Sequence, residues 1–451
     1  MSGKGSENTP IPTSDPGDAK TSERCPGGGS LQQFRTLDHA PASSHGTYLH
    51  GINEGLESLE KYQDGGFHPV HLGDCLGVSS RYRVVHKLGH GGFGTVWLCR
   101  DTLDAQYVAL KVLAADASTE ELVDLTLAQL DKSISGAEYI AIPLDHFSFE
   151  GPNGTHRCIV LPVLGPCVSP SLWLTMDKDP VPVLRKMAHQ AAQALDFLHK
   201  NHLCHGDFRP SNILVKLANI NHLSEQEMLS LLGQPQTPQV RTESEEGLPA
   251  SAPRYLVAPA DISRLGTEYL TDQISVIDFG ESFSFSSPPE YLGIPENYLP
   301  PEMLLEEEGS VGPPCDLWAL GCTLFAIRQQ IPLFYMIFDK DELLAEMVRF
   351  FGKLPPEWWG KWEGREKFFN DQGQWIQYGE VEEEWTLEVL LSKPMEIVHP
   401  GQNHKPGANT SLHTLESEQR LMADLFYKLF QYEPSKRISA EEVLQHEWFK
   451  M

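Results

Sequence analysis

Hydrophobic and polar residues follow a strand-like pattern in the first part of the chain and a helical pattern later. Five early runs are rich in β-branched and aromatic residues, at 82–88, 95–99, 107–112, 140–149 and 158–163. Runs of this length and composition are typical of β-strands, and short connections between them favour antiparallel pairing. The pattern therefore predicts a small, mainly antiparallel sheet.

One helix is expected within this first part of the chain. The segment 118–131 reads STEELVDLTLAQLD, with Ser118 as a plausible N-cap. Glu121 stands three residues later, which is the spacing of a capping box. We therefore predict a single helix over 118–131, packed against the sheet.

The later part of the chain has a helical period. Between Val183 and Asn201, apolar residues recur on one face, at Leu184, Met187, Ala191, Leu195 and Leu198. A stripe of this kind is the core-facing side of a helix. The segment Asp316–Arg328 is apolar nearly all round and should be a buried helix.

Changes in composition divide the chain into parts. Residues 1–45 have the Gly-, Ser- and Pro-rich composition of a disordered tail, and 46–81 are expected to be an extension that packs on the next domain. Residues 82–451 form the expected domain, with a boundary between its two lobes after residue 164. An insertion at 216–271 contains a capping box at Ser224 that is expected to open a short helix. A connection this long is either functional or partly disordered.

Composition narrows the class of protein. The formal net charge of −27 argues against direct binding of nucleic acid, whose partners are basic, and suits a basic protein partner. The eight cysteines contain no C-x-x-C pair and are expected to be reduced thiols. The start of the chain lacks the apolar core of a signal peptide, and no apolar run is long enough for a membrane span. We expect a soluble, intracellular monomer without membrane attachment.

The segment 203–215 (LCHGDFRPSNILV) places two oxygen-bearing side chains in one short loop. Asp207 precedes Asn212 by five residues, Pro210 lies between them, and a β-type run follows. A carboxylate in such a loop can orient a hydroxyl group and accept its proton, and an amide oxygen can bind Mg²⁺. Taken alone, the loop could equally be an Asx-rich turn.

A glycine-rich segment of the form G-x-G-x-x-G-x-V lies between two of the predicted strands. Its candidate nucleotide-binding residues are Leu88, Gly89, His90, Gly91, Gly92, Phe93, Gly94, Thr95 and Val96. Glycines allow backbone N–H groups to approach phosphates without a side-chain clash. A dinucleotide-binding turn would lead into a helix, whereas this one leads into a strand-like run. The sequence therefore predicts a β-hairpin over a nucleotide.

Two further positions fit a site for nucleotide and metal. Lys111 ends the run V-A-L-K, where a lysine can pair with phosphates, and Ala109 is a small residue suited to the wall of an adenine pocket. Asp278 follows a β-type run and precedes Phe279 and Gly280. A carboxylate at the end of a strand is suited to a phosphate-bound Mg²⁺.

In their order and spacing, these segments resemble the motifs of eukaryotic-type protein kinases. His205, Asp207 and Asn212 match the catalytic loop, Lys111 the phosphate-binding lysine and Asp278 the D-F-G aspartate. Other positions match the A-P-E segment, the D-x-W-x-x-G helix start and a late arginine. These are Pro300, Pro301, Glu302, Asp316, Trp318, Gly321 and Arg437.

At a finer level the chain resembles the SR-protein kinase group and its fungal relatives. This resemblance rests on 65–74, 85–93, 151–154 and 278–283, and on the position of the insertion. It implies a two-lobed α+β fold, with a small β-rich N-lobe at 82–164 and a larger helical C-lobe at 165–451. It also implies ATP- and Mg²⁺-dependent phosphorylation of serine in basic Arg/Ser-rich protein substrates.

The resemblance implies a role for each matched residue. Asp207 would orient the hydroxyl and accept its proton, and Asn212 and Asp278 would hold Mg²⁺. Lys111 and the amides of the glycine-rich segment would hold the phosphates. The hinge at 162–164 would bind adenine through the carbonyl of Pro162 and the N–H of Leu164.

Three positions depart from the family pattern. Gly206 replaces the arginine that usually meets a phosphorylated activation loop, so we predict activity without such phosphorylation. Arg209 replaces the catalytic-loop lysine, keeping the charge but changing the geometry. The helix-C glutamate that should pair with Lys111 is not evident, and Glu121 and Asp124 are both candidates.

Two other functions remain open. The H-G-D sequence at 205–207 resembles small-molecule phosphotransferases, although these lack the Pro-Pro-Glu and Asp-x-Trp features. The changes at Gly206 and Arg209 are compatible with a non-catalytic pseudokinase that serves as a scaffold. We interpret the acidic runs at 306–308 and 382–384 as solvated surface, and the aromatic residues near 358–369 as core.

Overall fold

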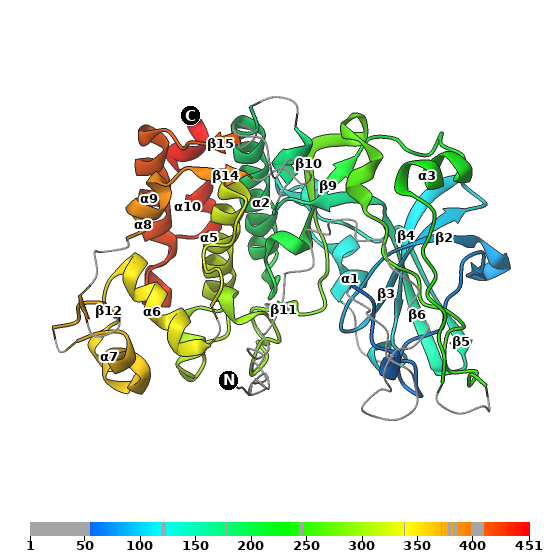
Figure 1. Ribbon diagram of the computed structural model, residues 1–451, viewed down its shortest axis with the longest axis horizontal. Helices are drawn as coiled ribbons and strands as arrows, with labels where there is room; N and C mark the ends of the chain where they lie inside the picture. Colours follow the sequence, from blue (N-terminus) through cyan, green and yellow to red (C-terminus); the bar gives the residue numbers. More distant parts are fainter. Residues whose placement is uncertain are drawn as a thin grey trace, which may run out of the picture.

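The chain folds into a lobe of strands and a lobe of helices, which lie side by side (Figure 1). This arrangement confirms the predicted α+β, two-lobed architecture. The computed structural model describes residues 55–118, 123–170, 172–176, 179–242, 247–337, 339–370, 372–377, 380–381, 386–397 and 410–451. Among these residues, no helix is both long and apolar enough to cross a membrane.

The N-lobe is built on a six-stranded antiparallel sheet with the strand order β1-β2-β3-β4-β6-β5. Its strands are β1 (Cys75–Leu76), β2 (Tyr82–His90), β3 (Gly94–Asp101), β4 (Gln106–Leu113), β5 (Asp145–Gly151) and β6 (Gly154–Pro162). The predicted strand at 140–149 begins only at Asp145. Pro143 lacks the N–H that a ladder requires, so the residues before it cannot extend the strand.

The single helix predicted over 118–131 is wrong. The described part contains a 3₁₀ turn ending at Ser118, the short helix α1 (Val123–Thr126) and a second 3₁₀ turn at Leu127–Gln129. Ser118 does not cap a helix, because its hydroxyl donates to the carbonyl of Ala114 (2.8 Å) and accepts from the amide of Arg157 (2.9 Å). Glu121 lies outside the described residues. Tertiary hydrogen bonds of Ser118 thus replace the capping that its sequence position suggested.

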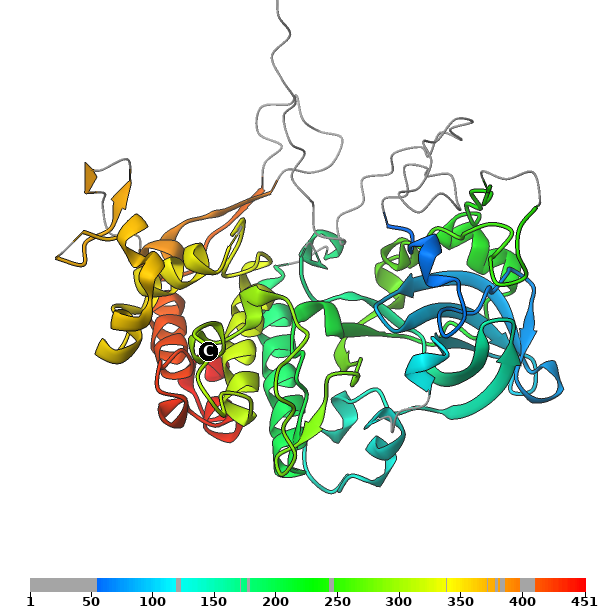
Figure 2. The same ribbon diagram turned by 90° about the horizontal axis from the view of Figure 1, so that it is seen from below.

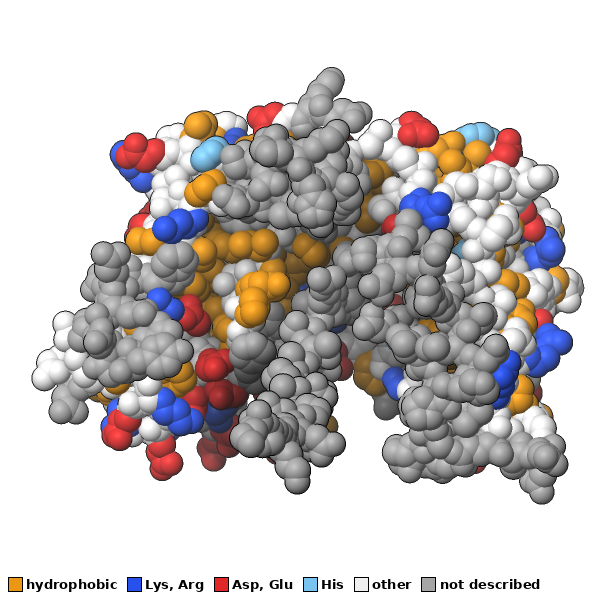
Figure 3. Space-filling model, viewed as in Figure 1, with side chains coloured by type: hydrophobic (Ala, Val, Ile, Leu, Met, Phe, Trp, Pro, Cys, Tyr) orange, Lys and Arg blue, Asp and Glu red, His pale blue; other side chains and the backbone are white. Residues whose placement is uncertain are grey.

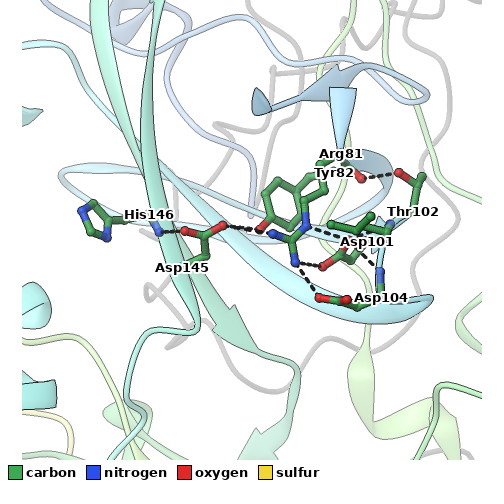
Figure 4. Close-up of polar contacts among 8 residues, drawn as sticks. Arg81, Tyr82, Asp101, Thr102, Asp104, Asp145 and His146 are labelled. Atoms are coloured by element: carbon green, nitrogen blue, oxygen red, sulfur yellow. Dashed lines mark hydrogen bonds and ion pairs between the residues drawn. The ribbon is translucent and has the colours of Figure 1, made fainter. Parts of the chain in front are cut away.

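One arginine joins three segments at the edge of the N-lobe (Figure 4). Arg81, just before β2, forms ion pairs with Asp101 at the end of β3, with Asp104 in the β3–β4 turn and with Asp145 at the start of β5. The hydroxyl of Tyr82 also donates to Asp145, at 2.8 Å. The guanidinium group has enough donors to serve several carboxylates at once, and it fixes this edge of the sheet.

The C-lobe is built around two long helices, α2 (Val181–Lys200) and α5 (Pro313–Gln329), which lie next to each other (Figure 1). The predicted stripe on α2 is confirmed, since its five apolar residues are at most 1% exposed. The described residues of α5 are buried from Cys315 onward, as predicted. Around them lie α4 (Pro301–Leu304), α6 (Lys340–Phe351), α7 (Pro356–Lys361), α8 (Leu387–Ser392), α9 (Glu416–Leu429) and α10 (Ala440–Leu444).

Short sheets connect the lobes and carry the loops between them. A three-stranded sheet has the order β10-β9-β7, and β8 pairs with β11. Two hairpins, β12–β13 and β14–β15, lie farther along the chain. The bounds are β7 (Leu164–Cys167), β8 (Leu203–Cys204), β9 (Ile213–Leu217), β10 (Leu270–Val276), β11 (Phe283–Ser284), β12 (Ile376–Gln377), β13 (Glu380–Val381), β14 (Met395–Ile397) and β15 (Thr410–Leu412).

The insertion that begins at residue 216 folds back onto the N-lobe sheet, although it follows C-lobe residues in the sequence. Its helix α3 (Glu225–Leu232) starts with the predicted capping box. In Figures 1 and 2 the green segment that contains α3 lies beside the blue strand β2. Met228 and Leu265 are buried against Leu98, and Val257 packs in the cluster of sheet residues that includes Trp97. Trp97 and Leu98 are successive residues of β3, so their side chains point to opposite faces. The described part of the insertion therefore packs on both faces of the sheet.

Candidate active site

The candidate catalytic loop lies between β8 and β9 and is held by its own side chains. The Nδ2 group of Asn212 donates to the backbone carbonyl of Asp207 (2.9 Å) and to its carboxylate (2.7 Å). The Nε group of Arg209 donates to both carboxylate oxygens of Asp207. Asp207 itself is 8% exposed. The carboxylate is thus fixed in orientation while keeping contact with solvent.

Two neighbouring segments anchor this loop. The amides of His205 and Gly206 donate to the carboxylate of Asp316 at the start of α5, at 2.8 and 3.0 Å. The Nε2 atom of His205 lies 3.1 Å from the carbonyl of Ile277, which precedes Asp278. Ile277 also donates its amide to the carbonyl of Asn212, at 2.9 Å. These bonds place Asn212 and Asp278 next to each other although 66 positions separate them in the sequence.

Lys111 on β4 and Asp278 form an ion pair, with 2.8 Å between Nζ and Oδ1. The lysine side chain is 16% exposed and the aspartate side chain 45%. Burial tends to lower the pKa of Lys111, but the carboxylates of Asp278 and Asp124 outweigh it, and the pKa lies above its usual value. Burial tends to raise the pKa of Asp278, but Lys111, with smaller contributions from His205 and Arg209, lowers it overall. Both groups are therefore charged at neutral pH.

Asp124 is the described candidate for the acidic partner on helix C. It lies on α1 and is 4% exposed. Burial raises the pKa of its carboxyl, and the charge of Lys111 offsets only part of that increase. Lys111 nevertheless forms its ion pair with Asp278.

The glycine-rich segment forms a hairpin between β2 and β3, in which His90 pairs with Thr95 and Gly89 with Val96. The chain continues as a strand, as predicted, which excludes a dinucleotide-binding turn. A Cβ atom on Gly94 would lie 2.3 Å from the carbonyl oxygen of Val112, so only glycine fits there. Among the described residues, no atom beyond the adjacent residues lies within 4 Å of a Cβ built on Gly89, Gly91 or Gly92, so this part of the chain leaves the space beside these glycines free.

The remaining predicted nucleotide-binding residues lie in the N-lobe sheet and at its connection to the C-lobe. Leu88 lies on β2, Phe93 lies at the turn of the hairpin, and Ala109 lies on β4. Pro162 ends β6 and Leu164 begins β7, so the predicted hinge joins the two sheets.

Comparison with known proteins decides the family. Residues 82–225 and 268–449 match the family described as "Protein kinase domain". The chain belongs to the protein kinase family. The unmatched stretch between these two segments falls within the insertion.

Individual relatives of this kinase come from several eukaryotes. It is 26% identical over 416 residues to "Serine/threonine-protein kinase SRPK" of Physarum polycephalum, covering 86% of this chain and 90% of the relative. It is 39% identical to human "SRSF protein kinase 3", over 36% of this chain and 30% of that protein. Human "Dual specificity protein kinase CLK1" is 26% identical over 84% of this chain and 67% of its own length. These matches confirm the predicted resemblance to the SR-protein kinase group.

The kinase has no room for a side chain at Gly206. This residue has a φ of +79°, and a Cβ atom would lie 2.1 Å from the carbonyl oxygen of Glu281. The hydroxyl of Ser282 donates to the carbonyl of His205 (2.7 Å), and the Glu281 carboxylate accepts from the amide of Gly293 (3.3 Å). The segment that follows Asp278 therefore packs directly on the catalytic loop of the kinase.

A buried ion pair joins two distant segments of the C-lobe of the kinase. The carboxylate of Glu302 accepts two hydrogen bonds from Arg437, at 2.6 and 2.7 Å. Both residues are at most 6% exposed. The pair joins the Pro-Pro-Glu segment to the late arginine, two positions that match motifs of the family.

The acidic and aromatic segments of the kinase have structural contacts. Glu306 and Glu307 pair with Lys340 and Lys361, and Figure 3 shows acidic and basic side chains interspersed near α6. The run at 382–384 lies outside the described residues. The described aromatic residues pack on one another and on the main core, as predicted; they are Trp358, Trp359, Trp362, Phe368 and Phe369.

Sequence reasoning missed the residues that contact the glycine-rich hairpin from outside. Lys61 donates to the carbonyls of Gly91 and Gly92, and Glu57 forms a buried ion pair with Lys87. These contacts join positions about 30 residues apart and follow no motif or period. The nearest signal was the pair of glycines at 65–66, which indicates a tight turn in this extension.

Proposed function

We propose that this kinase transfers the γ-phosphoryl group of ATP to serine or threonine hydroxyls of protein substrates. One observation carries the proposal: the bonds of Ile277 bring the pair Asp207–Asn212 beside the pair Lys111–Asp278. Protein kinases place these four functions around the phosphates and the acceptor hydroxyl.

The chemistry of these side chains fits ATP and Mg²⁺. The Nδ2 group of Asn212 is bound to Asp207, which leaves its amide oxygen for a metal ion. That oxygen and the Asp278 carboxylate are hard ligands of the type that Mg²⁺ prefers. When bound, Mg²⁺ would neutralise charge on the phosphate oxygens. Lys111 and the amides of the glycine-rich hairpin would hold the phosphates, and Pro162 and Leu164 would bind adenine.

Asp207 and Arg209 would have separate roles in the transfer step. Asp207 would orient the acceptor hydroxyl and accept its proton, which in enzymes contributes roughly 10²–10⁴ in rate. Arg209, bound to the same carboxylate, would keep Asp207 in place and add positive charge beside the transferred group. Positioning and charge stabilisation account for most of the catalysis in this class of reaction.

We propose basic, Arg/Ser-rich segments as the substrates. Two relatives bear names that refer to SR-type kinases, "SRPK" and "SRSF protein kinase 3". The net charge of −27 favours association with a basic peptide through electrostatic attraction. A protein that presents such a segment would be the partner, whereas the same negative charge disfavours direct binding of nucleic acid.

Transfer of radiolabelled phosphate tests this function. With Mg-ATP, the wild-type protein should label an Arg/Ser repeat peptide, but neither a basic serine-free peptide nor small alcohols. Asp207→Ala should reduce labelling to the background. Equal labelling by wild type and Asp207→Ala would reject the kinase function, and labelling of small alcohols alone would favour a small-molecule phosphotransferase.

A pseudokinase that acts as a scaffold is the second candidate. The observation that favours it is the ion pair of Lys111 with Asp278, while Asp124 on the short helix α1 stays without a recorded bond to the lysine. Phosphate transfer by the wild type and by Asp207→Ala, measured alongside the thermal shift with Mg-ATP, separates the two candidates. A scaffold would show no catalytic difference from Asp207→Ala, whether or not Mg-ATP stabilises it.

A further inference from the structure

The described part of the N-terminal extension forms hydrogen bonds with the glycine-rich hairpin. The Nζ group of Lys61 donates to the carbonyls of Gly91 and Gly92, at 3.4 and 3.3 Å. The Nε2 atom of His90 lies 3.1 Å from the carbonyl oxygen of Gly55. Three successive residues at the tip of the hairpin are therefore bonded to a segment that precedes the kinase domain match.

A buried ion pair fixes this extension to the base of the same hairpin. Glu57 pairs with Lys87 on β2, and the two residues are 4% and 0% exposed. The hydroxyl of Tyr62 donates to the other oxygen of Glu57, at 2.6 Å. Burial tends to raise the pKa of Glu57, but Lys87 lowers it overall, so the carboxylate is charged. Because the charges lie in the interior, removing either partner would leave the other buried and unpaired.

The middle of the extension is bonded to the residues that follow β4, the strand that carries Lys111. The amides of Ala115 and Asp116 donate to the carbonyls of Gly66 and Gly65, at 3.0 and 2.8 Å. The preceding amide, of Ala114, donates to the carbonyl of Phe93 in the hairpin, at 2.9 Å. The residues after β4 thus bind the hairpin and the extension together. The turn that carries Lys61 is therefore held on one side by the Glu57–Lys87 ion pair and on the other by the hydrogen bonds of Gly65 and Gly66.

Glycine makes this turn of the extension feasible. A Cβ atom on Gly66 would lie 2.0 Å from the carbonyl oxygen of Lys61, which itself accepts a bond from the amide of Phe67 (2.7 Å). The Lys61 ammonium also lies 5.0 Å from the centre of the Phe67 ring. The backbone and the side chain of Lys61 are therefore both held in place.

The bonds from Lys61 set the direction of the amides in the hairpin. In a trans peptide the C=O and N–H groups point in opposite directions. When the carbonyls of Gly91 and Gly92 face Lys61, the N–H groups of Gly92 and Phe93 must face away from the extension. Within the described part of the chain these two N–H groups have no recorded hydrogen-bond acceptor. They remain available to an anion on the side away from Lys61.

We propose that Lys61 is a positioning residue, which holds the glycine-rich hairpin in the conformation that receives the phosphates of ATP. The proposal rests on the ATP-dependent function given above. A glycine-rich hairpin has many accessible backbone conformations, and restricting them before the nucleotide binds reduces the entropy lost on binding. Lys61 supplies that restriction without contacting the nucleotide itself.

Variants at two positions of one turn test the proposal. Lys61→Met keeps the aliphatic chain and removes the ammonium, whereas Lys61→Arg restores a donor. Gln63→Met is the matched control, because Gln63 is exposed and its side chain forms no hydrogen bond with any described residue. The readouts are the Kd for a non-hydrolysable ATP analogue with Mg²⁺, the KM for ATP, kcat and Tm.

We expect Lys61→Met to raise the Kd and the KM roughly fivefold to tenfold, with kcat at saturating ATP within about twofold of wild type. Lys61→Arg and Gln63→Met should stay within about twofold of wild type in every constant. A Kd of Lys61→Met equal to that of Gln63→Met would overturn the positioning role alone. A large loss of Tm in Lys61→Met would show that Lys61 serves folding and would overturn it too. Absence of Mg-nucleotide binding by the wild type would overturn both this role and the proposed function.

Discussion

The single Nε–H group of Arg209 is shared between the two carboxylate oxygens of Asp207, with Nε 2.8 Å from one oxygen and 2.9 Å from the other. The terminal nitrogens of its guanidinium group are thereby left to face other partners. A lysine at this position would have a single nitrogen both to hold the Asp207 carboxylate and to contact the transferred phosphoryl group. The exchange of lysine for arginine therefore separates holding the base from contacting the transferred group.

We predict that Arg209→Ala lowers kcat by about 10²-fold, because it removes a positive charge beside the reacting groups and frees the Asp207 carboxylate. Arg209→Lys should recover part of this loss. Steady-state phosphorylation of an Arg/Ser peptide measures both. If Arg209→Ala retained the wild-type kcat, the arginine would serve only the folded structure.

Activity should not depend on phosphorylation of the segment between Asp278 and Glu302. Glu281 and Ser282 bind this segment to Gly293 and to the catalytic loop, and Gly206 leaves no arginine to meet a phosphate. After phosphatase treatment, verified by mass spectrometry, kcat should stay within about twofold of the untreated protein. A loss of activity that an added upstream kinase restores would contradict this prediction.

The buried pair of Glu302 and Arg437 should contribute strongly to stability. Glu302→Gln removes the charge opposite an arginine that is 6% exposed, and breaking such a pair costs about 3–5 kcal/mol. Urea unfolding followed by fluorescence measures the difference. The control is Glu308→Gln, at an exposed position of the same segment, which should change the free energy of unfolding by less than about 0.5 kcal/mol. Equal effects of the two variants would refute the prediction.

Acid should destabilise the fold partly through His68. Burial, and to a smaller extent His156, lowers the pKa of His68 from 6.5 to about 4, while Asp74 acts in the opposite direction. Its ring packs on Phe149 and His156, with ring centres 4.6 and 5.0 Å apart. Since the folded state disfavours the charged form, the stabilisation is complete above pH 6.5 and is lost as the pH falls toward 4. At pH 5 the loss is about 2 kcal/mol.

Thermal unfolding of His68→Phe at pH 7 and pH 5 measures this effect. The variant should lose less Tm between the two pH values than the wild type does. His146→Phe, at an exposed position, is the control and should retain the wild-type pH dependence. A variant at His68 with an unchanged pH dependence would assign the acid sensitivity to other groups.

Those features of the site that local sequence determines could be predicted. The hairpin around Gly94 follows from glycine spacing between strand-like runs, and the loop from Asp207 to Asn212 from a motif within a few residues. The helix expected at 118–131 failed for the opposite reason. Ser118 has the right residue type for a cap, but its hydroxyl bonds to Ala114 and Arg157, the latter 39 residues away. Propensity is overridden when tertiary partners compete for the same atom.

Contacts between segments that are distant in the sequence could not be predicted, because no local sequence pattern indicates them. The pairing of Lys61 with the hairpin carbonyls joins a side chain to backbone atoms, which any residue type could provide. The packing of the insertion on the N-lobe sheet could not be predicted, because the insertion follows the catalytic loop in the sequence and nothing in its local pattern indicates a return to the N-lobe. The only indication was the general rule that a long connection within a compact domain is usually either functional or disordered.

The course of the insertion changes how the two lobes can move. It leaves from β9, packs against Leu98 and Trp97 in the N-lobe, and returns at β10. The polypeptide therefore crosses between the lobes three times, once at 162–164 and twice through the insertion. Rotation about a single pivot would have to stretch the two additional crossings or detach them from the sheet. Relative motion of the two lobes is thus restricted at three connections, and shortening or loosening any one of them would alter the rate at which a nucleotide enters and leaves.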